Sequence, residues 1–325
     1  MNKQQFTSLS VTLLACSSLS AAWSSFALPN RDAGSTPAFS HLSDGRVLYA
    51  HHGTVYRQDT FGNSTLSEYT NAPDNTGSSE TYSFIASNGF AGSTVSFGAG
   101  PVYTFDSGNL SSTFSSSGPI QSYYGVSYTP DSALIVGANG GSGQSEVGHY
   151  TDAGVYTTVI EDVSLFSGGI TLDGAGNLYV IDNDDLNIYS YSAAQVAGAL
   201  IGLPLQISDG TLITSLGVSG SIAVDSQGRI FATGYQLAGI QVYDMNTGDS
   251  GTLIPNLNNA NYSVETFSDG SDDYVAFVNW ESYSPGAGVL YGYDLDGNVP
   301  VPEPSAYALI AGAFAMLTLQ RRRRS

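Results

Sequence analysis

The sequence has 325 residues, charged side chains at only 11% of its positions, and a formal net charge of −19. Residues 28–302 contain four basic and 27 acidic side chains, and a body with a net charge of −23 repels phosphate backbones, which argues against a nucleic-acid partner. The only cysteine, Cys16, and the only lysine, Lys3, precede this body, which excludes disulfide bonds, thiolate metal sites and lysine-dependent catalysis within it.

Residues 1–27 have the features of a signal peptide. Lys3 supplies the positive start, an apolar stretch runs from Phe6 to Ala15, and Ser25-Phe26-Ala27 forms a small-x-small cleavage site. These features predict cleavage after Ala27 and export of the remaining chain.

A second interpretation of the leader is lipidation. Leu13-Leu14-Ala15-Cys16 resembles a lipoprotein processing site, and in that alternative Cys16 becomes a lipidated N-terminus.

The body contains six repeats of one pattern. In each repeat, alternating apolar residues lead to a turn with Asp, Gly or Asn, and a second apolar run follows, as in Ile170–Val180 and Ile222–Phe231. The turns lie at positions 44, 88, 131, 173, 225 and 269, at intervals of 44, 43, 42, 52 and 44 residues. Asp-Gly between alternating apolar runs predicts a β-hairpin, because that turn needs a residue with positive φ.

A third apolar strand follows each hairpin, and a short fourth strand such as Val155–Ile160 usually comes next. Four strands in a period near 44 residues predict an all-β fold, a six-bladed β-propeller over residues 28–298. Accidental spacing in a β-sandwich or β-helix is the alternative. The one long interval contains Ala193–Leu200, which predicts a short helix inserted between two repeats. Residues Ala38 to Leu42 are expected to pair with the end of the last repeat and seal the ring.

The sequence pattern of the repeats resembles that of the NHL and SMP-30/gluconolactonase group of six-bladed propellers. The shared pattern is apolar-x-apolar-Asp-x-x-Gly-x-Leu-Tyr-Val with a later Ile-x-x-Tyr/Phe, and it is clearest over residues 167–245. The resemblance implies a propeller fold and says little about function. In the lactonase branch it also implies one divalent metal held by Glu, Asn and Asp side chains from different blades, a set that we do not find in this sequence.

Two groups of residues are candidates for ligand binding. Asp182, Asp184 and Asp185 follow an apolar strand and offer hard oxygen ligands that suit calcium, with a solvated β-turn as the alternative. Trp280 and Tyr283, flanked by amide and carboxylate side chains, form a pair that stacks on a sugar ring, with packing between blades as the alternative. No serine-hydrolase elbow, zincin motif or dinucleotide fingerprint occurs, and we predict no catalytic residue.

Residues 299–325 carry the most specific signal in the chain. Pro302-Glu303-Pro304 precedes an apolar run from Ala306 to Leu319, and Arg321, Arg322, Arg323 and Arg324 follow. The prolines hold an extended segment that a peptidase accepts, the apolar run partitions into a bilayer, and the arginines stop translocation. The run is about 21 Å long as a helix, against about 30 Å of hydrocarbon, so it predicts a transient anchor.

This arrangement resembles the PEP-CTERM sorting signal of Gram-negative bacteria. The resemblance implies recognition by an exosortase, removal of the tail, and association with extracellular polysaccharide and biofilm matrix. The sequence therefore predicts an exported protein that is transiently anchored in the inner membrane and then lies at the outer surface or outside the cell. A non-enzymatic binding or structural role is expected, and a metal-dependent hydrolase or lactonase of the SMP-30 type is the alternative.

Overall fold

The computed structural model describes residues 23–31, 38–41, 46–51, 54–59, 67–71, 83–86, 93–97, 102–106, 109–114, 120–128, 134–140, 145–151, 155–164, 169–217, 220–234, 239–255, 260–268, 273–280 and 286–295. The start of the predicted leader, the Pro-Glu-Pro motif, the apolar tail and the four terminal arginines lie outside these residues.

The strands form six sheets, and each sheet has one innermost strand and extends outward from it. From the inside outward, sheet 1 contains β2 (Ala38–His41), β3 (Val47–His51), β4 (Thr54–Gln58) and β5 (Ser67–Asn71). In the same direction, sheet 2 contains β6 (Ser83–Ala86), β7 (Ser93–Phe97), β8 (Val102–Asp106) and β9 (Asn109–Phe114). Sheet 3 contains β10 (Ile120–Tyr128), β11 (Leu134–Gly140), β12 (Ser145–Tyr150), β13 (Tyr156–Val163) and β17 (Leu205–Gln206).

The second half of the chain repeats the arrangement. Sheet 4 contains β14 (Ile170–Leu172), β15 (Leu178–Asp182), β16 (Asn187–Tyr191) and β18 (Thr211–Ser215). Sheet 5 contains β19 (Ile222–Val224), β20 (Arg229–Ala232), β21 (Gly239–Asp244) and β22 (Ser250–Pro255). Sheet 6 contains β23 (Ala260–Ser268), β24 (Asp273–Trp280), β25 (Gly286–Asp294) and β1 (Trp23–Arg31).

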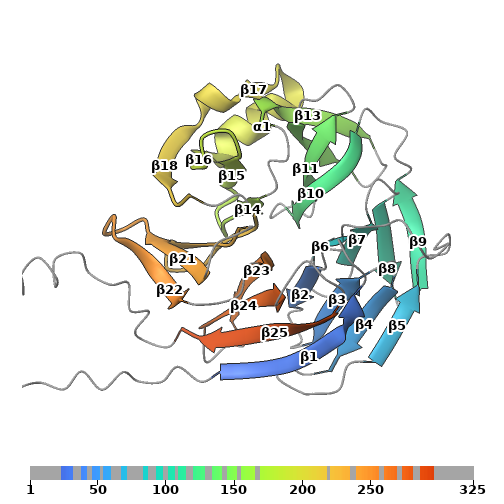
Figure 1. Cartoon of the computed structure of the whole chain (residues 1–325). Helices are drawn as coiled ribbons and strands as arrows, with labels where there is room; N and C mark the ends of the chain where they lie inside the picture. Colours follow the sequence, from blue (N-terminus) through green and yellow to red (C-terminus); the bar gives the residue numbers. More distant parts are fainter. Residues whose placement is uncertain are drawn as a thin grey trace, which may run out of the picture.

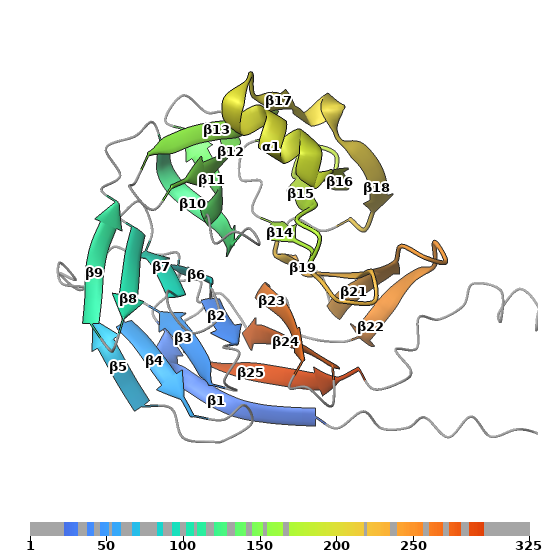
Figure 2. The same cartoon turned by 180° about the vertical axis from the view of Figure 1, so that it is seen from behind.

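The six sheets stand around a ring, which the two opposite views show plainly (Figures 1 and 2). The first strand of each sheet contacts the first strand of the next, in the order β2, β6, β10, β14, β19 and β23, and β23 contacts β2. The six predicted hairpins are confirmed, because in every sheet the first two strands of the repeat pair antiparallel across the predicted turn.

The core lies between neighbouring sheets, which explains why the middle strands are apolar at consecutive positions. In β15, Leu178 and Val180 pack toward sheet 3, whereas Tyr179 and Ile181 pack toward sheet 5. Successive side chains of a strand point to opposite faces, so a strand that is buried on both faces has no polar alternation. All five residues of β15 are buried, including Asp182 at its end.

The ring closes differently from the sequence-based prediction. Residues 38–41 form β2 and pair with β3 of their own sheet, so the expected pairing of Ala38–Leu42 with the last repeat is wrong. The strand that joins the last sheet is β1, which pairs antiparallel with β25 from Trp23↔Tyr293 to Arg31↔Gly286. Five residues of β1 belong to the segment predicted as leader, which is why the sequence pattern did not identify it as a strand.

The predicted helix is confirmed, but its predicted place between two repeats is wrong, because it follows β16 and precedes β18 of the same sheet, sheet 4. Helix α1 (Ala193–Ile201) begins at Ser192, whose hydroxyl accepts a hydrogen bond from the Gln195 amide while the Gln195 side chain accepts one from the Ser192 amide. This capping box satisfies amides that the first helical turn leaves free. After the helix, β17 pairs in parallel with the outer strand β13 of sheet 3, which the sequence did not predict.

The turn between the first two strands uses a different glycine from the one predicted. At Asp173-Gly174-Ala175-Gly176, the residue with positive φ is Gly176 at 82°, and at Asp225 the equivalent residue is Gly228 at 80°. The carboxylate of the aspartate holds the turn from its first position, so the left-handed residue is needed three positions later, just before the strand resumes. Glycine adopts that conformation without the Cβ penalty.

Candidate functional site

The three candidate calcium ligands lie in the turn that follows β15. Asp182 is buried, and its Oδ1 accepts hydrogen bonds of 3.3 Å from the amides of Ser164 and Asp184. The hydroxyl of Ser164 accepts two further amide hydrogen bonds from the same turn, from Asn183 at 2.7 Å and from Asp184 at 3.0 Å. Asp182 and Ser164 therefore tie the turn of sheet 4 to the end of β13 in sheet 3.

Asp185 is also engaged within its own turn. Its Oδ1 accepts a hydrogen bond from the Asn187 amide at 2.9 Å, and its Oδ2 accepts one from the Tyr189 hydroxyl at 2.7 Å. The side chain of Asp184 is exposed. Within the described ranges, no group of three or more His, Cys, Asp or Glu side chains is arranged to hold a metal ion. The arrangement of the three candidates is that of a hydrogen-bonded turn.

The aspartates of the repeats have a similar structural role. Asp173 accepts hydrogen bonds from the amides of Ala175 and Asn177, both at 2.9 Å, and from the Tyr179 hydroxyl at 3.2 Å. Burial and the nearby Asp173 carboxylate raise the pKa of Tyr179 to about 12, so its hydroxyl stays protonated and remains a donor. A carboxylate that accepts backbone amides stabilises the hairpin without any ligand.

Asp225 occupies the equivalent turn of sheet 5, and there it also binds a buried arginine. Its Oδ1 accepts hydrogen bonds from the amides of Gln227 and Arg229, and its Oδ2 accepts one of 2.6 Å from Arg229 Nε. The side chains of Arg229 and Asp225 are only 9% and 4% exposed. The guanidinium also lies 5.7 Å from the centre of the Phe231 ring. This ion pair is shielded from solvent, so its electrostatic attraction is much less screened than that of a surface pair.

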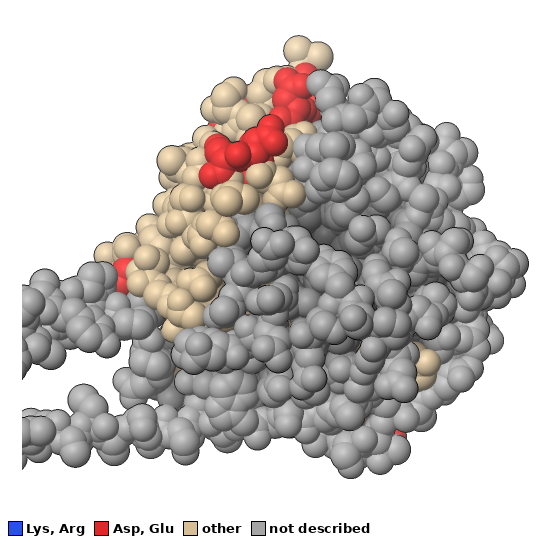
Figure 3. Space-filling view, viewed as in Figure 1, with Lys and Arg blue, Asp and Glu red and all other residues tan. Residues whose placement is uncertain are grey.

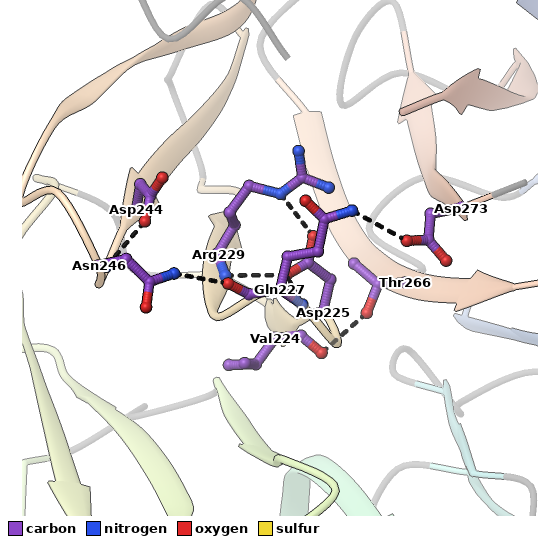
Figure 4. A network of polar contacts seen from close by, with 8 residues as sticks. All are labelled: Val224, Asp225, Gln227, Arg229, Asp244, Asn246, Thr266 and Asp273. Carbon is purple, nitrogen blue, oxygen red and sulfur yellow. Dashed lines mark hydrogen bonds and ion pairs between the residues drawn. The ribbon is translucent and has the colours of Figure 1, made fainter. Parts of the chain in front are cut away.

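The Asp225 turn makes polar contacts with the other turn of sheet 5 and with strands β23 and β24 of sheet 6, as the close view shows (Figure 4). The Asn246 side chain donates a hydrogen bond of 2.7 Å to the Gln227 carbonyl, which joins the two turns of sheet 5. The Gln227 side chain donates one of 3.2 Å to Asp273 of β24, and the Thr266 hydroxyl of β23 donates one of 3.0 Å to the Val224 carbonyl. The network joins sheets 5 and 6 by polar contacts at their shared boundary.

A further acidic side chain lies between the innermost strands of the first and last sheets. Glu265 of β23 accepts a hydrogen bond of 2.9 Å from the Ser40 hydroxyl and one of 2.6 Å from the His41 amide, both on β2. Burial of the carboxyl group raises the pKa of Glu265 to about 8, although both hydrogen bonds act to lower it. No sequence signal marked this residue, because its partners are more than 220 positions away in the chain.

The described part of one face of the molecule is acidic. On the face shown in Figure 3, its charged side chains are carboxylates, and no lysine or arginine of the described residues is visible there. Exposed acidic residues around sheets 3 and 4 are Glu161, Asp162, Asp184, Asp185 and Asp209. These carboxylates keep the surface hydrated and repel other anions.

The remaining predicted residues are described in part or not at all. Trp280 ends β24, opposite Ala260 and Gly288, and only its backbone is described, whereas Tyr283 lies outside the described residues. Ala27 is in β1 opposite Val289. Pro302, Glu303, Pro304, Arg321, Arg322, Arg323 and Arg324 lie outside the described residues. Among the helices of the described part, none is long and apolar enough to cross a membrane.

Comparison with known proteins identifies the fold. No family model and no curated protein matches the sequence. Among solved structures, the calcium-binding protein regucalcin from Agrobacterium tumefaciens str. C58 superposes with a TM-score of 0.61 at 13% identity, covering 83% of this chain and 93% of its own. A luciferin-regenerating enzyme gives 0.57 at 11% identity, with coverage of 83% and 94%.

A third match, the PQQ-bound aldose sugar dehydrogenase from Streptomyces coelicolor, gives a TM-score of 0.58 at 13% identity and covers 84% of this chain and 99% of its own. These structures are β-propellers, and the chain has a β-propeller fold. The identities are low and the functions named for the three proteins differ, so the likeness concerns the fold alone.

Proposed function

We propose that this chain is an exported six-bladed β-propeller that acts at the cell surface as a non-enzymatic binding or structural module. The six sheets are its six blades. The N-terminal leader directs export, and residues 299–325 are a sorting signal that an exosortase recognises at Pro302-Glu303-Pro304.

The observation that carries the proposal is the pairing of β1 with β25. Trp23, the first residue of β1, lies opposite Tyr293, near the end of β25. The part of the predicted leader that precedes Trp23 and the tail after Leu295 are therefore connected to the same end of two paired strands. Only residues 296–301 separate Leu295 from Pro302, and the seven steps between these two residues reach at most about 25 Å. This geometry supports the proposed transient anchoring, because the two ends of the described domain to which the apolar segments are joined lie next to each other.

The non-enzymatic role rests on how the carboxylates are used. Asp173, Asp185 and Asp225 accept hydrogen bonds from their own turns, and Asp182 accepts them from two sheets. Carboxylates with these contacts stabilise hairpins and blade boundaries. Regucalcin is described as calcium-binding, and that likeness is the observation in favour of the alternative, a metal-dependent hydrolase or lactonase.

The proposed partners follow from the two ends and the surface of the domain. An exosortase removes the tail, and extracellular polysaccharide is the ligand class, with Trp280 and Tyr283 as the residues that stack on sugar rings. The acidic surface favours a neutral polysaccharide over an acidic one, because like charges repel across the interface.

Export and sorting are tested by expressing the full-length chain in a Gram-negative host with an exosortase and in the same host without it. We expect a shortened protein at the outer surface or in the medium in the first host, and a tailed protein in the inner-membrane fraction in the second. A soluble cytoplasmic protein in both hosts would contradict the proposal.

The binding role is tested on the protein recovered from the first host. We expect it to co-sediment with neutral matrix polysaccharide and to turn over no lactone. Lactone turnover that disappears with a chelator would replace the binding role by the metal-dependent alternative.

A further inference from the structure

We infer that the leader is cleaved between Ala22 and Trp23, five residues upstream of the predicted site at Ala27. The inference rests on the proposed export. In the reaction, water adds across the Ala22–Trp23 peptide bond, which leaves a carboxylate on Ala22 and an amino group on Trp23. The mature chain then begins with the first residue of β1.

The register of β1 provides the main argument. Seven residues of β1 pair with β25, and five of them, Trp23, Ser24, Ser25, Phe26 and Ala27, lie before the bond that follows Ala27. Cleavage at that bond leaves only Asn30 and Arg31 paired, beyond an irregularity in the ladder. Strands in folded proteins usually have at least three residues, so cleavage there leaves a strand below the usual length at the very start of the chain, where no preceding residues hold it.

Loss of those five residues also exposes the edge of the last sheet. Trp23–Ala27 pair with Val289–Tyr293, whose sequence is Val-Leu-Tyr-Gly-Tyr. An uncharged strand rich in β-branched and aromatic residues is a template for pairing with another chain when its edge is free. A mature protein that keeps residues 23–27 covers this edge with its own chain.

The sequence before Trp23 fits a peptidase that requires small residues at the first and third positions before the bond. Ser20-Ala21-Ala22 meets this requirement as well as Ser25-Phe26-Ala27 does. The two sites are equivalent by sequence alone. The structure separates them, because one bond lies at the boundary of β1 and the other lies inside the strand.

The test is N-terminal sequencing and intact-mass measurement of the full-length chain, expressed with its own leader in a Gram-negative host and recovered outside the cytoplasm. We expect an N-terminus at Trp23. An exported protein that begins at Leu28, or at a lipidated Cys16, would overturn the assigned bond and leave export intact. An unprocessed chain that stays in the cytoplasm would overturn the proposed export, and the inference with it.

A matched pair of variants tests the same bond by a different measurement. Ala22→Val and Ala27→Val each replace the small residue directly before one of the two candidate bonds with a side chain that suits a strand. We expect Ala22→Val to increase the ratio of precursor to mature protein at least tenfold in a pulse-labelling experiment, and Ala27→Val to leave it unchanged. The opposite result would place the cut after Ala27.

Discussion

The carboxyl group of Glu265 accepts a hydrogen bond of 2.9 Å from the Ser40 hydroxyl, and this contact joins the innermost strand of the last sheet to that of the first. The His41 amide donates to the other carboxyl oxygen, and the His41 ring stacks on Phe267 at a centroid distance of 3.7 Å. The first and last parts of the chain are therefore joined in two places. The Glu265 contact joins them on the inner side of the ring, and the pairing of β1 with β25 joins them at its outer edge.

The Glu265 contact predicts a pH dependence of stability. The pKa of Glu265 is about 8 in the folded protein, above its ordinary value of 4.5, so the folded state binds more protons than the unfolded state between these pH values. The free energy of unfolding therefore decreases as the pH rises through this window, by at most about 1.4 kcal/mol per pH unit from this group. Urea denaturation at pH 5, 6, 7 and 8 measures the slope.

Two variants test whether Glu265 causes this change of the free energy of unfolding with pH. Glu265→Gln removes the titrating group, and we expect its stability to decrease less steeply with pH than that of the unmodified protein. Asp184→Asn, at an exposed side chain, serves as the control and keeps the original slope. An unchanged slope in Glu265→Gln would show that other groups cause the pH dependence.

The equivalent turns of sheets 4 and 5 allow a direct comparison of an aspartate that is paired with a buried arginine and an aspartate that has neutral hydrogen-bond donors. Asp225→Ala leaves Arg229 buried without its carboxylate, and we expect a loss of about 3–5 kcal/mol. Asp173→Ala removes hydrogen bonds from backbone amides, from the Asn177 side chain and from the Tyr179 hydroxyl, all neutral donors, and we expect a loss of about 1–3 kcal/mol. Equal losses, measured by urea denaturation, would mean that the ion pair adds nothing to the turn.

The double variant Asp225→Ala/Arg229→Met completes the comparison. Because it removes the uncompensated buried charge, it should be more stable than Asp225→Ala alone. A double variant less stable than the single one would contradict this account of Arg229.

Gln58 predicts a stabilising substitution. It is fully buried at the end of β4, and no described residue hydrogen-bonds to its Oε1 or Nε2. Gln58→Met keeps the length of the side chain and removes two polar atoms that lack partners, so we expect a gain of about 1–3 kcal/mol. Gln241→Met is the control, since Gln241 Oε1 accepts a hydrogen bond from Thr252, and it should not gain stability. A loss in Gln58→Met would indicate that its amide has a partner in solution.

Calcium distinguishes the proposed role from the metal-dependent alternative. A site at a hundredfold excess over its Kd adds about 2.7 kcal/mol, which is roughly 5–10 °C in a domain of this size. Because the carboxylates of Asp182 and Asp185 accept hydrogen bonds in their turn, we expect the Tm of the exported protein to be the same with calcium and with chelator. A calcium-dependent increase of that size would favour the hydrolase alternative, and Asp182→Asn would show whether the turn after β15 is the site.

The repeats were predictable because they combine local signals. Alternating apolar residues on either side of a turn residue recur at nearly constant spacing and predicted the hairpins, and the long interval between two turns predicted the helix that begins at Ala193. The position of the left-handed glycine was wrong, because the prediction used the Asp-Gly dipeptide and not the hydrogen bonds of the Asp173 carboxylate.

The features that position the candidate site were less predictable because they depend on long-range contacts. Nothing near Glu265 in the sequence indicates Ser40, and the two-residue strand β17 is too short to have a pattern. Strand β1 was hidden for a different reason. The small and apolar residues of a cleavage site also suit a β-strand, so the same segment fits both the end of a leader and the start of a strand.

Surface accessibility tests the central claim most directly. Intact cells of a Gram-negative host with an exosortase, expressing the full-length chain, are treated with a protease that does not enter them, and the surviving domain is then quantified. We expect the domain to be degraded on intact cells or recovered from the medium, while a cytoplasmic marker survives. A domain that is absent from the medium and stays protected until the cells are lysed would contradict the assignment of this propeller to the cell surface.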